Sequence, residues 1–139
     1  MKKLLLLLFS LTLSFNSYGE WVELGVSDGV SGFIELDAIK ERSDGHVYWW
    51  MMLSDVNESE KYHFKSDCEG ERTYLLQYDF HTEPMGGGEV SSTNPDAGWQ
   101  YHAPDTKMNF FIKFVCGLAK GTLQERQTSI EEFLDFINE

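Results

Sequence analysis

Four histidines are the side chains in this sequence with the most direct potential for metal or acid–base chemistry. They are His46, His63, His81 and His102, and each falls in a different expected element. None has the H-x-x-x-H or H-E-x-x-H spacing that places two imidazoles side by side on a helix. A shared metal site would require the fold to gather them, and solvated or hydrogen-bonded histidines are the simpler interpretation.

Other patterns of catalytic residues are missing or lie in the wrong context. The G-x-S-x-G pattern occurs at Gly25-Val26-Ser27-Asp28-Gly29, but Ser27-Asp28-Gly29 is expected to be a turn between two strands, whereas the hydrolase nucleophile lies on a turn from a strand into a helix. Met85-Gly86-Gly87-Gly88 lacks the Lys-Ser/Thr pair of a phosphate-binding loop, and it is predicted to be a flexible loop or a turn that needs positive φ. Carboxylates are too numerous for any one pair to be informative. We therefore predict no enzymatic activity and no cofactor.

The first residues predict the compartment. Lys2-Lys3 is followed by an apolar run, Leu4–Phe15, and then by Ser17-Tyr18-Gly19, whose small residues suit a cleavage site. This pattern is typical of a signal peptide, and the apolar run is shorter than the roughly 20 residues that span a bilayer. We expect cleavage after Gly19, a mature chain that begins at Glu20, and an extracytoplasmic location: periplasm, cell surface or secreted.

Export determines how the two cysteines, Cys68 and Cys116, are interpreted. An oxidising compartment forms and preserves disulfides, so we predict that they pair with each other. A metal or redox pair is the alternative, but these cysteines lack the close spacing of C-x-x-C.

The negative charge of the chain excludes polyanionic partners. Its formal net charge is −12, and loss of the two leader lysines brings it to −14. Such a chain repels nucleic acid, heparin-like polymers and anionic lipid surfaces, all of which bind basic patches. We predict no nucleic-acid partner and no transmembrane segment, and we interpret most of the acidic residues as a solvated surface.

Alternating apolar residues bounded by turn signals predict a series of short strands. They are expected at Glu20–Gly25, Ser31–Leu36, His46–Leu53, Lys61–Ser66, Glu71–Thr82 and Trp99–Ala103. Glu69-Gly70 predicts a hairpin turn. Asp37–Arg42 is expected to form at most a turn or two of helix, and Glu83–Gly98 to be irregular.

Two helices are predicted after the strands. The first has an apolar stripe at helical spacing, made of Met108, Phe111, Ile112, Val115 and Cys116. Asp105 or Thr106 could cap it, and a strand is the alternative. The second begins with the capping-box pattern Thr128-Ser129-Ile130-Glu131. Its stripe is Ile130, Phe133, Leu134 and Ile137.

Strands first and helices last predict an α+β fold with an antiparallel sheet covered by a helix. The disulfide would hold that helix on the sheet. Residues 1–19 are expected to be the signal peptide and 20–139 a single domain, with a core at 20–117 and a C-terminal helical extension at 118–139.

Short motifs in a fixed order carry a resemblance to a known family. They are Trp21-Val22-Glu23-Leu24-Gly25, Leu36-Asp37-Ala38-Ile39, Tyr48-Trp49-Trp50, Asp67-Cys68-Glu69-Gly70-Glu71-Arg72, Pro84-Met85-Gly86-Gly87-Gly88, Trp99-x-Tyr101-x-x-Pro104 and Phe114-Val115-Cys116. The ordered set resembles the surface-adhesin protein E family. The resemblance implies a six-stranded antiparallel sheet with a disulfide-tethered helix, a surface or extracytoplasmic location in Gram-negative bacteria, and adhesion to host cells and matrix proteins. The archetype's adhesive contacts are linked to a basic segment, whereas Glu83–Tyr101 carries no Lys or Arg here.

Aromatic residues supply the candidate interaction surface, because Trp and Tyr are enriched at binding hot spots. The candidates are Trp49, Trp50, Trp99 and Tyr101, with core packing as the alternative. We predict a non-enzymatic exported domain that acts by protein–protein or cell-surface interaction, with a host matrix or envelope protein as the class of partner. The alternative is a periplasmic accessory domain that binds a small ligand in a pocket beside Trp99. The strand His46–Leu53, apolar on both faces, further suggests a homodimer.

Overall fold

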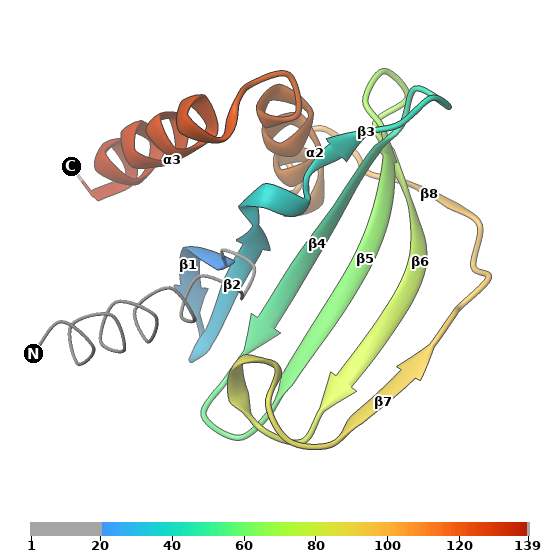
Figure 1. Cartoon of the computed structure of the whole chain (residues 1–139), viewed down its shortest axis with the longest axis vertical. Helices are drawn as coiled ribbons and strands as arrows, with labels where there is room; N and C mark the ends of the chain where they lie inside the picture. The colour runs from blue at the N-terminus through green and yellow to red at the C-terminus, as the bar shows by residue number, and fades with distance from the viewer. Residues whose placement is uncertain (1–20, 139) are drawn as a thin grey trace, which may run out of the picture.

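The computed structural model describes residues 21–138 (Figure 1), so the signal peptide predicted at 1–19 lies outside the described residues. The described chain forms one antiparallel sheet of eight strands and two α-helices. The strands are β1 (Trp21–Ser27), β2 (Val30–Glu35), β3 (Lys40–Glu41), β4 (Val47–Ser54), β5 (Ser59–Asp67), β6 (Arg72–His81), β7 (Val90–Thr93) and β8 (Trp99–Tyr101). The helices are α2 (Lys107–Leu118) and α3 (Leu123–Asn138), with short 3₁₀ turns η2 (Leu36–Ala38) and η3 (Pro84–Gly86).

Six strands form the main path, in the order β1-β2-β4-β5-β6-β7. The two additional strands are short: β3 pairs with β4, and β8 pairs with β6. Figure 1 shows β4, β5 and β6 as long curved strands, with α2 near one end of them. The predicted α+β class and antiparallel sheet are confirmed. Five of the six expected strands are β1, β2, β4, β5 and β6, and the sixth, Trp99–Ala103, is β8, which lies off the main path.

The side-chain alternation of β4 divides the sheet into two faces. Val47, Trp49 and Met51 are buried on the side where α2 packs, which we call the covered face. Tyr48 and Trp50 point to the opposite side, which we call the open face, because successive residues of a strand alternate. The apolar character of both sides of β4 therefore has a structural reason within the monomer: one side joins the core and the other forms a surface.

The core lies between the covered face and α2. Ile112 and Val115 of α2 are fully buried, and Val115 belongs to the same buried cluster as Ile34 and Trp49. Trp49 is 0% exposed, and its indole Nε1 donates a hydrogen bond to Ser66 Oγ at 2.8 Å. A large apolar ring is thus fully buried while its one polar atom is satisfied, as close packing requires.

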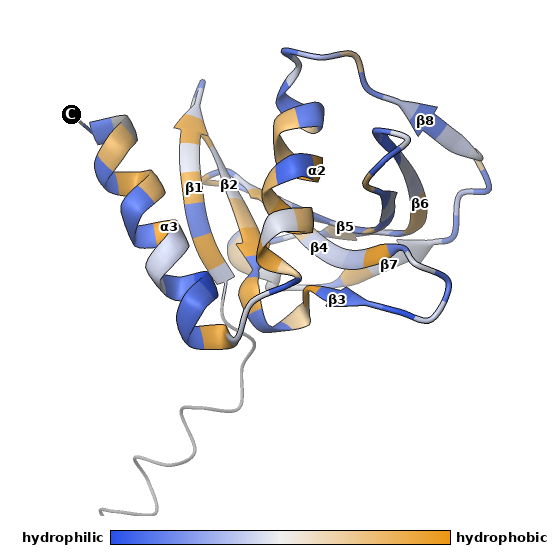
Figure 2. Cartoon of the chain, turned by 90° about the horizontal axis from the view of Figure 1, so that it is seen from above, coloured by the Kyte–Doolittle hydropathy of each residue, from blue (hydrophilic) through white to orange (hydrophobic). Residues whose placement is uncertain are grey.

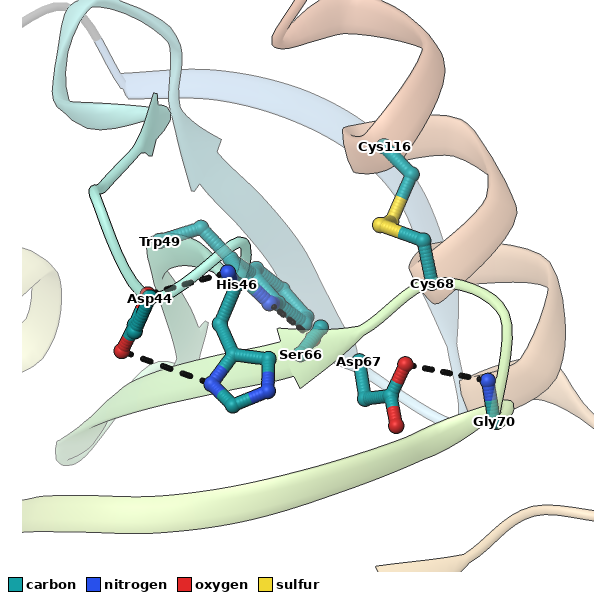
Figure 3. Close-up of a disulfide and its surroundings, with 8 residues drawn as sticks. All are labelled: Asp44, His46, Trp49, Ser66, Asp67, Cys68, Gly70 and Cys116. Carbon is teal, nitrogen blue, oxygen red and sulfur yellow. Dashed lines mark hydrogen bonds and ion pairs between the residues drawn. A yellow bond between two sulfur atoms is a disulfide. The ribbon is translucent and has the colours of Figure 1, made fainter.

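A disulfide links the sheet to α2, as predicted (Figure 3). Cys68 follows the last residue of β5, and its sulfur is bonded to that of Cys116 in α2, with the two Cα atoms 6.1 Å apart. Next to it, the carboxylate of Asp67 accepts a hydrogen bond from the Gly70 N–H at 3.1 Å and one from Arg72 Nε at 2.9 Å. The tight turn between β5 and β6 is therefore held by side chains on both sides of Gly70.

Thr106 is the cap of α2, and its Oγ1 accepts a hydrogen bond from the Asn109 N–H. The helical interpretation of this segment is therefore confirmed over the strand alternative. For α3 the predicted capping box at residues 128–131 is wrong. The reciprocal pair is Thr122 and Glu125: each backbone N–H donates to the side chain of the other, at 2.8 and 3.2 Å. The predicted start lies inside α3, where the Thr128 hydroxyl instead donates to a carbonyl one turn earlier.

Two further predictions are corrected. The helix expected at Asp37–Arg42 is instead the 3₁₀ turn η2 followed by β3, because Lys40 and Glu41 pair with β4. The segment Glu83–Gly98 is not wholly irregular, since it contains η3 and β7. In both places, pairing with a distant strand overrides the weak local preference.

Candidate functional site

The centre of the open face is a stacked pair of rings. Trp50 of β4 and His63 of β5 are direct cross-strand partners, and their rings lie parallel, 3° apart in plane and 4.4 Å between centroids. Burial lowers the pKa of His63, and the nearby positive charge of Arg42 lowers it further. The imidazole is therefore neutral at neutral pH, which suits flat stacking on an indole.

Tyr48 extends this pair along β4. The guanidinium carbon of Arg42 lies 3.9 Å from the centroid of the Tyr48 ring, the geometry of a cation–π contact. The hydroxyl of Tyr48 donates to the carboxylate of Asp44, and this hydrogen bond lowers the pKa of Asp44. The segment before β4 thus supplies both a cation, Arg42, and an anion, Asp44, that contact the side chain of Tyr48.

Trp99 of β8 connects the open face to the end of the sheet near the disulfide. Its ring meets His46 edge-on at 5.0 Å and Tyr74 edge-on at 5.7 Å. The ammonium of Lys65 lies 5.3 Å from its centroid and the guanidinium of Arg72 lies 4.3 Å from it. Trp99 is therefore surrounded by contacts and holds the short strand β8 on β6.

Lys65 and Arg72 link the rings into a continuous surface. Lys65 is the cross-strand partner of both Tyr48 and Tyr74, and its ammonium lies 4.8 Å from the Tyr74 ring. Arg72 also reaches the ring of Tyr101 at 5.9 Å. Tyr101 itself is 75% exposed, which makes it the most accessible aromatic side chain of this surface.

We call this surface the aromatic patch. It consists of Arg42, Tyr48, Trp50, His63, Lys65, Arg72, Tyr74, Trp99 and Tyr101. Its side chains are rings and cations, which can stack and form charge-assisted contacts with a partner.

The glycine-rich loop closes the other end of the open face. Ser54 Oγ accepts a hydrogen bond from the Met85 N–H at 3.0 Å, and Ser59 Oγ accepts one from the Gly86 N–H at 2.8 Å. Met85 and Gly86 both have positive φ, at 57° and 74°. The prediction of a turn that needs positive φ is confirmed. The two hydroxyls hold the loop over Met52, which is fully buried.

The four predicted aromatic candidates do not all belong to the surface. Trp49 lies in the core, so its assignment to an interaction surface is wrong, and its neighbour Trp50 faces the other way. Trp50, Trp99 and Tyr101 all lie on the open face, and cross-strand pairing with β5 and β6 connects them. Sequence reasoning missed Tyr48, and the alternation of β4 was the signal that could have separated it from Trp49.

The histidines stay apart. His46 contacts Trp99, His63 stacks on Trp50, His81 is buried near the end of β6, and His102 lies 2.8 Å from the Thr73 hydroxyl. Within residues 21–138, no three His, Cys, Asp or Glu side chains are grouped so that they could hold a metal ion. In the same range, no helix has the length and apolar character needed to cross a membrane.

Comparison with known proteins gives a consistent picture. The surface-adhesin protein E family model matches residues 21–117. A crystal structure of protein E from non-typeable Haemophilus influenzae superimposes with a TM-score of 0.58 at 14% identity, covering 83% of this chain and 99% of that one. Crystal form II of Haemophilus influenzae protein E gives a TM-score of 0.54 at 14% identity, covering 72% of this chain and 99% of that one. No curated protein matches the chain. Because the family model covers well over half of the chain, this protein belongs to the surface-adhesin protein E family.

Proposed function

We propose that this chain is a non-enzymatic exported domain that acts by protein–protein or cell-surface interaction, and that the aromatic patch is its contact surface. The observation that carries the proposal is the continuous run of rings and cations on the open face, from Trp50 through Lys65 to Tyr101. Tyr, Trp and Arg are the residues most enriched at binding hot spots. Membership of a surface-adhesin family supports the same class of function.

The charge of the patch indicates what kind of partner fits it. The chain is strongly acidic overall, yet Arg42, Lys65 and Arg72 converge on these rings. Arg72 is paired with Asp67, whereas Lys65 makes no ion pair within the described residues. We therefore propose a host matrix or envelope protein that presents carboxylates and apolar side chains. A basic partner would be attracted to the rest of the surface instead.

Binding to a panel of matrix and envelope proteins by surface plasmon resonance tests this proposal. We expect at least one partner with micromolar or better affinity, and Tyr101→Ala should weaken it about tenfold, the scale of a hot-spot loss. Phe136→Ala is the matched control, because Phe136 on α3 is also 75% exposed but lies outside the patch. Absence of micromolar binding across the panel would exclude adhesion, and equal losses in both variants would exclude the patch.

We further propose that residues 20–139 act as one exported domain that includes α3. Arg126 of α3 supports this, since its guanidinium donates to the carbonyls of Leu36 and Ile39, both at 2.9 Å, and Ile130 of α3 is buried in the common core. The disulfide supports an oxidising extracytoplasmic compartment. The homodimer remains a prediction, and sedimentation at high concentration tests it. A single species with the mass of one domain would contradict it.

A further inference from the structure

A cavity of about 660 Å³ lies on the covered face of the sheet, between the β1–β2 hairpin and the two helices. Figure 2 shows this hairpin between α2 and α3 when the molecule is seen from above. The volume falls in the range of about 300–1,000 Å³ that small-molecule sites occupy. The aromatic patch is on the opposite face and Trp99 does not line the cavity, so the proposed function does not use it.

Two glycines create this hollow. Gly25 of β1 and Gly32 of β2 are direct cross-strand partners, and Gly32 also pairs with Leu53 of β4, whose side chain points to the covered face. Neither glycine has positive φ, so the backbone does not require glycine at either position. A Cβ on Gly25 would meet nothing within 4 Å, and one on Gly32 would meet only Leu53 Cδ2, at 3.8 Å. What the pair provides is space, and glycines inside strands often mark the close approach of a ligand.

The lining of the cavity is mostly apolar. Leu24 and Leu53 come from the sheet, and Phe110 of α2 and Phe133 of α3 lie beside them. The two phenyl rings are 5.4 Å apart, so they form one continuous wall across both helices. Phe110 is 43% exposed, an unusually high value for an apolar side chain that faces a hollow. The cavity therefore presents apolar surface that a ligand could cover.

The charged residues at the rim of the cavity indicate which charge a ligand would carry. Lys107 and Lys113 of α2 line the cavity, and Asp105 is the one acidic residue that does so. Lys113 is partly engaged, since its Nζ lies 3.3 Å from a carboxylate oxygen of Glu71, whereas Lys107 makes no ion pair within residues 21–138. Lys107 is therefore the cation at this rim that is left to pair with an anionic group of a ligand.

We propose that the cavity binds a free fatty acid, with the alkyl chain against Leu53, Phe110 and Phe133 and the carboxylate at Lys107. A mostly apolar hollow beside a lysine without an ion pair fits a ligand with one negative head group and a hydrocarbon tail. The source is a single amphiphile rather than a membrane, because the acidic surface of the whole chain is repelled by anionic lipid bilayers.

Isothermal titration calorimetry with dodecanoate and with dodecyltrimethylammonium, both below their critical micelle concentrations, tests whether binding depends on the charge of the head group. The two probes have alkyl tails of the same length. Dodecanoate should bind with one-to-one stoichiometry and at least about fivefold more tightly than the cation, the scale of one exposed charge pair. Equal affinities would contradict the role of the rim charge. No saturable binding of dodecanoate would overturn the proposal.

Filling the hollow tests its location. The double variant Gly25→Leu/Gly32→Leu places two side chains in the cavity without backbone strain, and should weaken dodecanoate binding at least about tenfold. Gly117→Leu is the matched control, because a Cβ there also meets nothing within 4 Å and Gly117 does not line the cavity. Thermal melting checks that each variant is folded. If the double variant does not fold, Lys107→Glu provides the second test: dodecanoate affinity should fall about fivefold, and unchanged affinity would refute the site.

Discussion

Removing the disulfide should destabilise this domain by an amount that the structure allows us to calculate. Cys68 and Cys116 are separated by 48 residues. In the chain-entropy model, a cross-link that closes a loop of this length stabilises the folded state by about 4 kcal/mol. Domains of this size are typically stable by only about 5–15 kcal/mol, so the double variant Cys68→Ser/Cys116→Ser should lose a large share of its stability.

The assay is urea unfolding of the oxidised protein, the reduced protein and the double variant, followed by circular dichroism. The reduced protein and the variant should have the same urea midpoint, lower than that of the oxidised protein. Their free energies of unfolding, extrapolated to water, should be about 4 kcal/mol below that of the oxidised protein. The disulfide borders a hollow of about 520 Å³ that is also lined by Glu41, Glu69 and Lys120, which should give a small reductant access to the sulfurs. A difference below about 1 kcal/mol would refute the reasoning, because it would mean that the packing of α2 alone holds the helix on the sheet.

Three further perturbations test other parts of the fold. Trp49→Phe removes the donor to the buried Ser66 hydroxyl and leaves a void, so it should cost about 3 kcal/mol in urea unfolding, whereas a cost under about 1 kcal/mol would contradict the tight packing described above. Arg126→Ala leaves the carbonyls of Leu36 and Ile39 without their donor and should lower the free energy of unfolding by about 2 kcal/mol, and an unchanged melting temperature would show that these hydrogen bonds do not stabilise the docking of α3. The lowered pKa of His63 means that the unfolded state takes up the proton first as the pH falls. Stability should therefore decline as the pH drops below about 6.5 and flatten below the folded-state pKa. Urea midpoints between about pH 5 and 8 should show a shallower decline for His63→Gln, and parallel curves would contradict this.

The sequence was sufficient for the features that depend on local pattern and on the compartment. The apolar stripe from Met108 to Cys116 predicted α2, the alternation around Tyr62 and Phe64 predicted β5, and the two cysteines predicted the link between them. Each of these signals lies within one element or follows from the redox chemistry of export.

Features that depend on distant pairing could not be predicted. Lys40 and Glu41 form a strand only because β4 offers them a free edge. Trp49 and Trp50 are adjacent and chemically identical, and only the position of α2 decides which of them is buried. The register shift of β5 against β6 near His63 also has no signature in the sequence, yet it helps to set which side chains of β6 reach the open face.

Hydroxyl-radical footprinting of the protein alone and in complex with its partner tests the central claim most directly. If the open face is the contact surface, Tyr101 and Trp50 should be oxidised more slowly in the complex, while the equally exposed Phe136 on α3 keeps its rate. Protection of Phe136 with no change at Tyr101 would contradict the account and would place the contact on the helices.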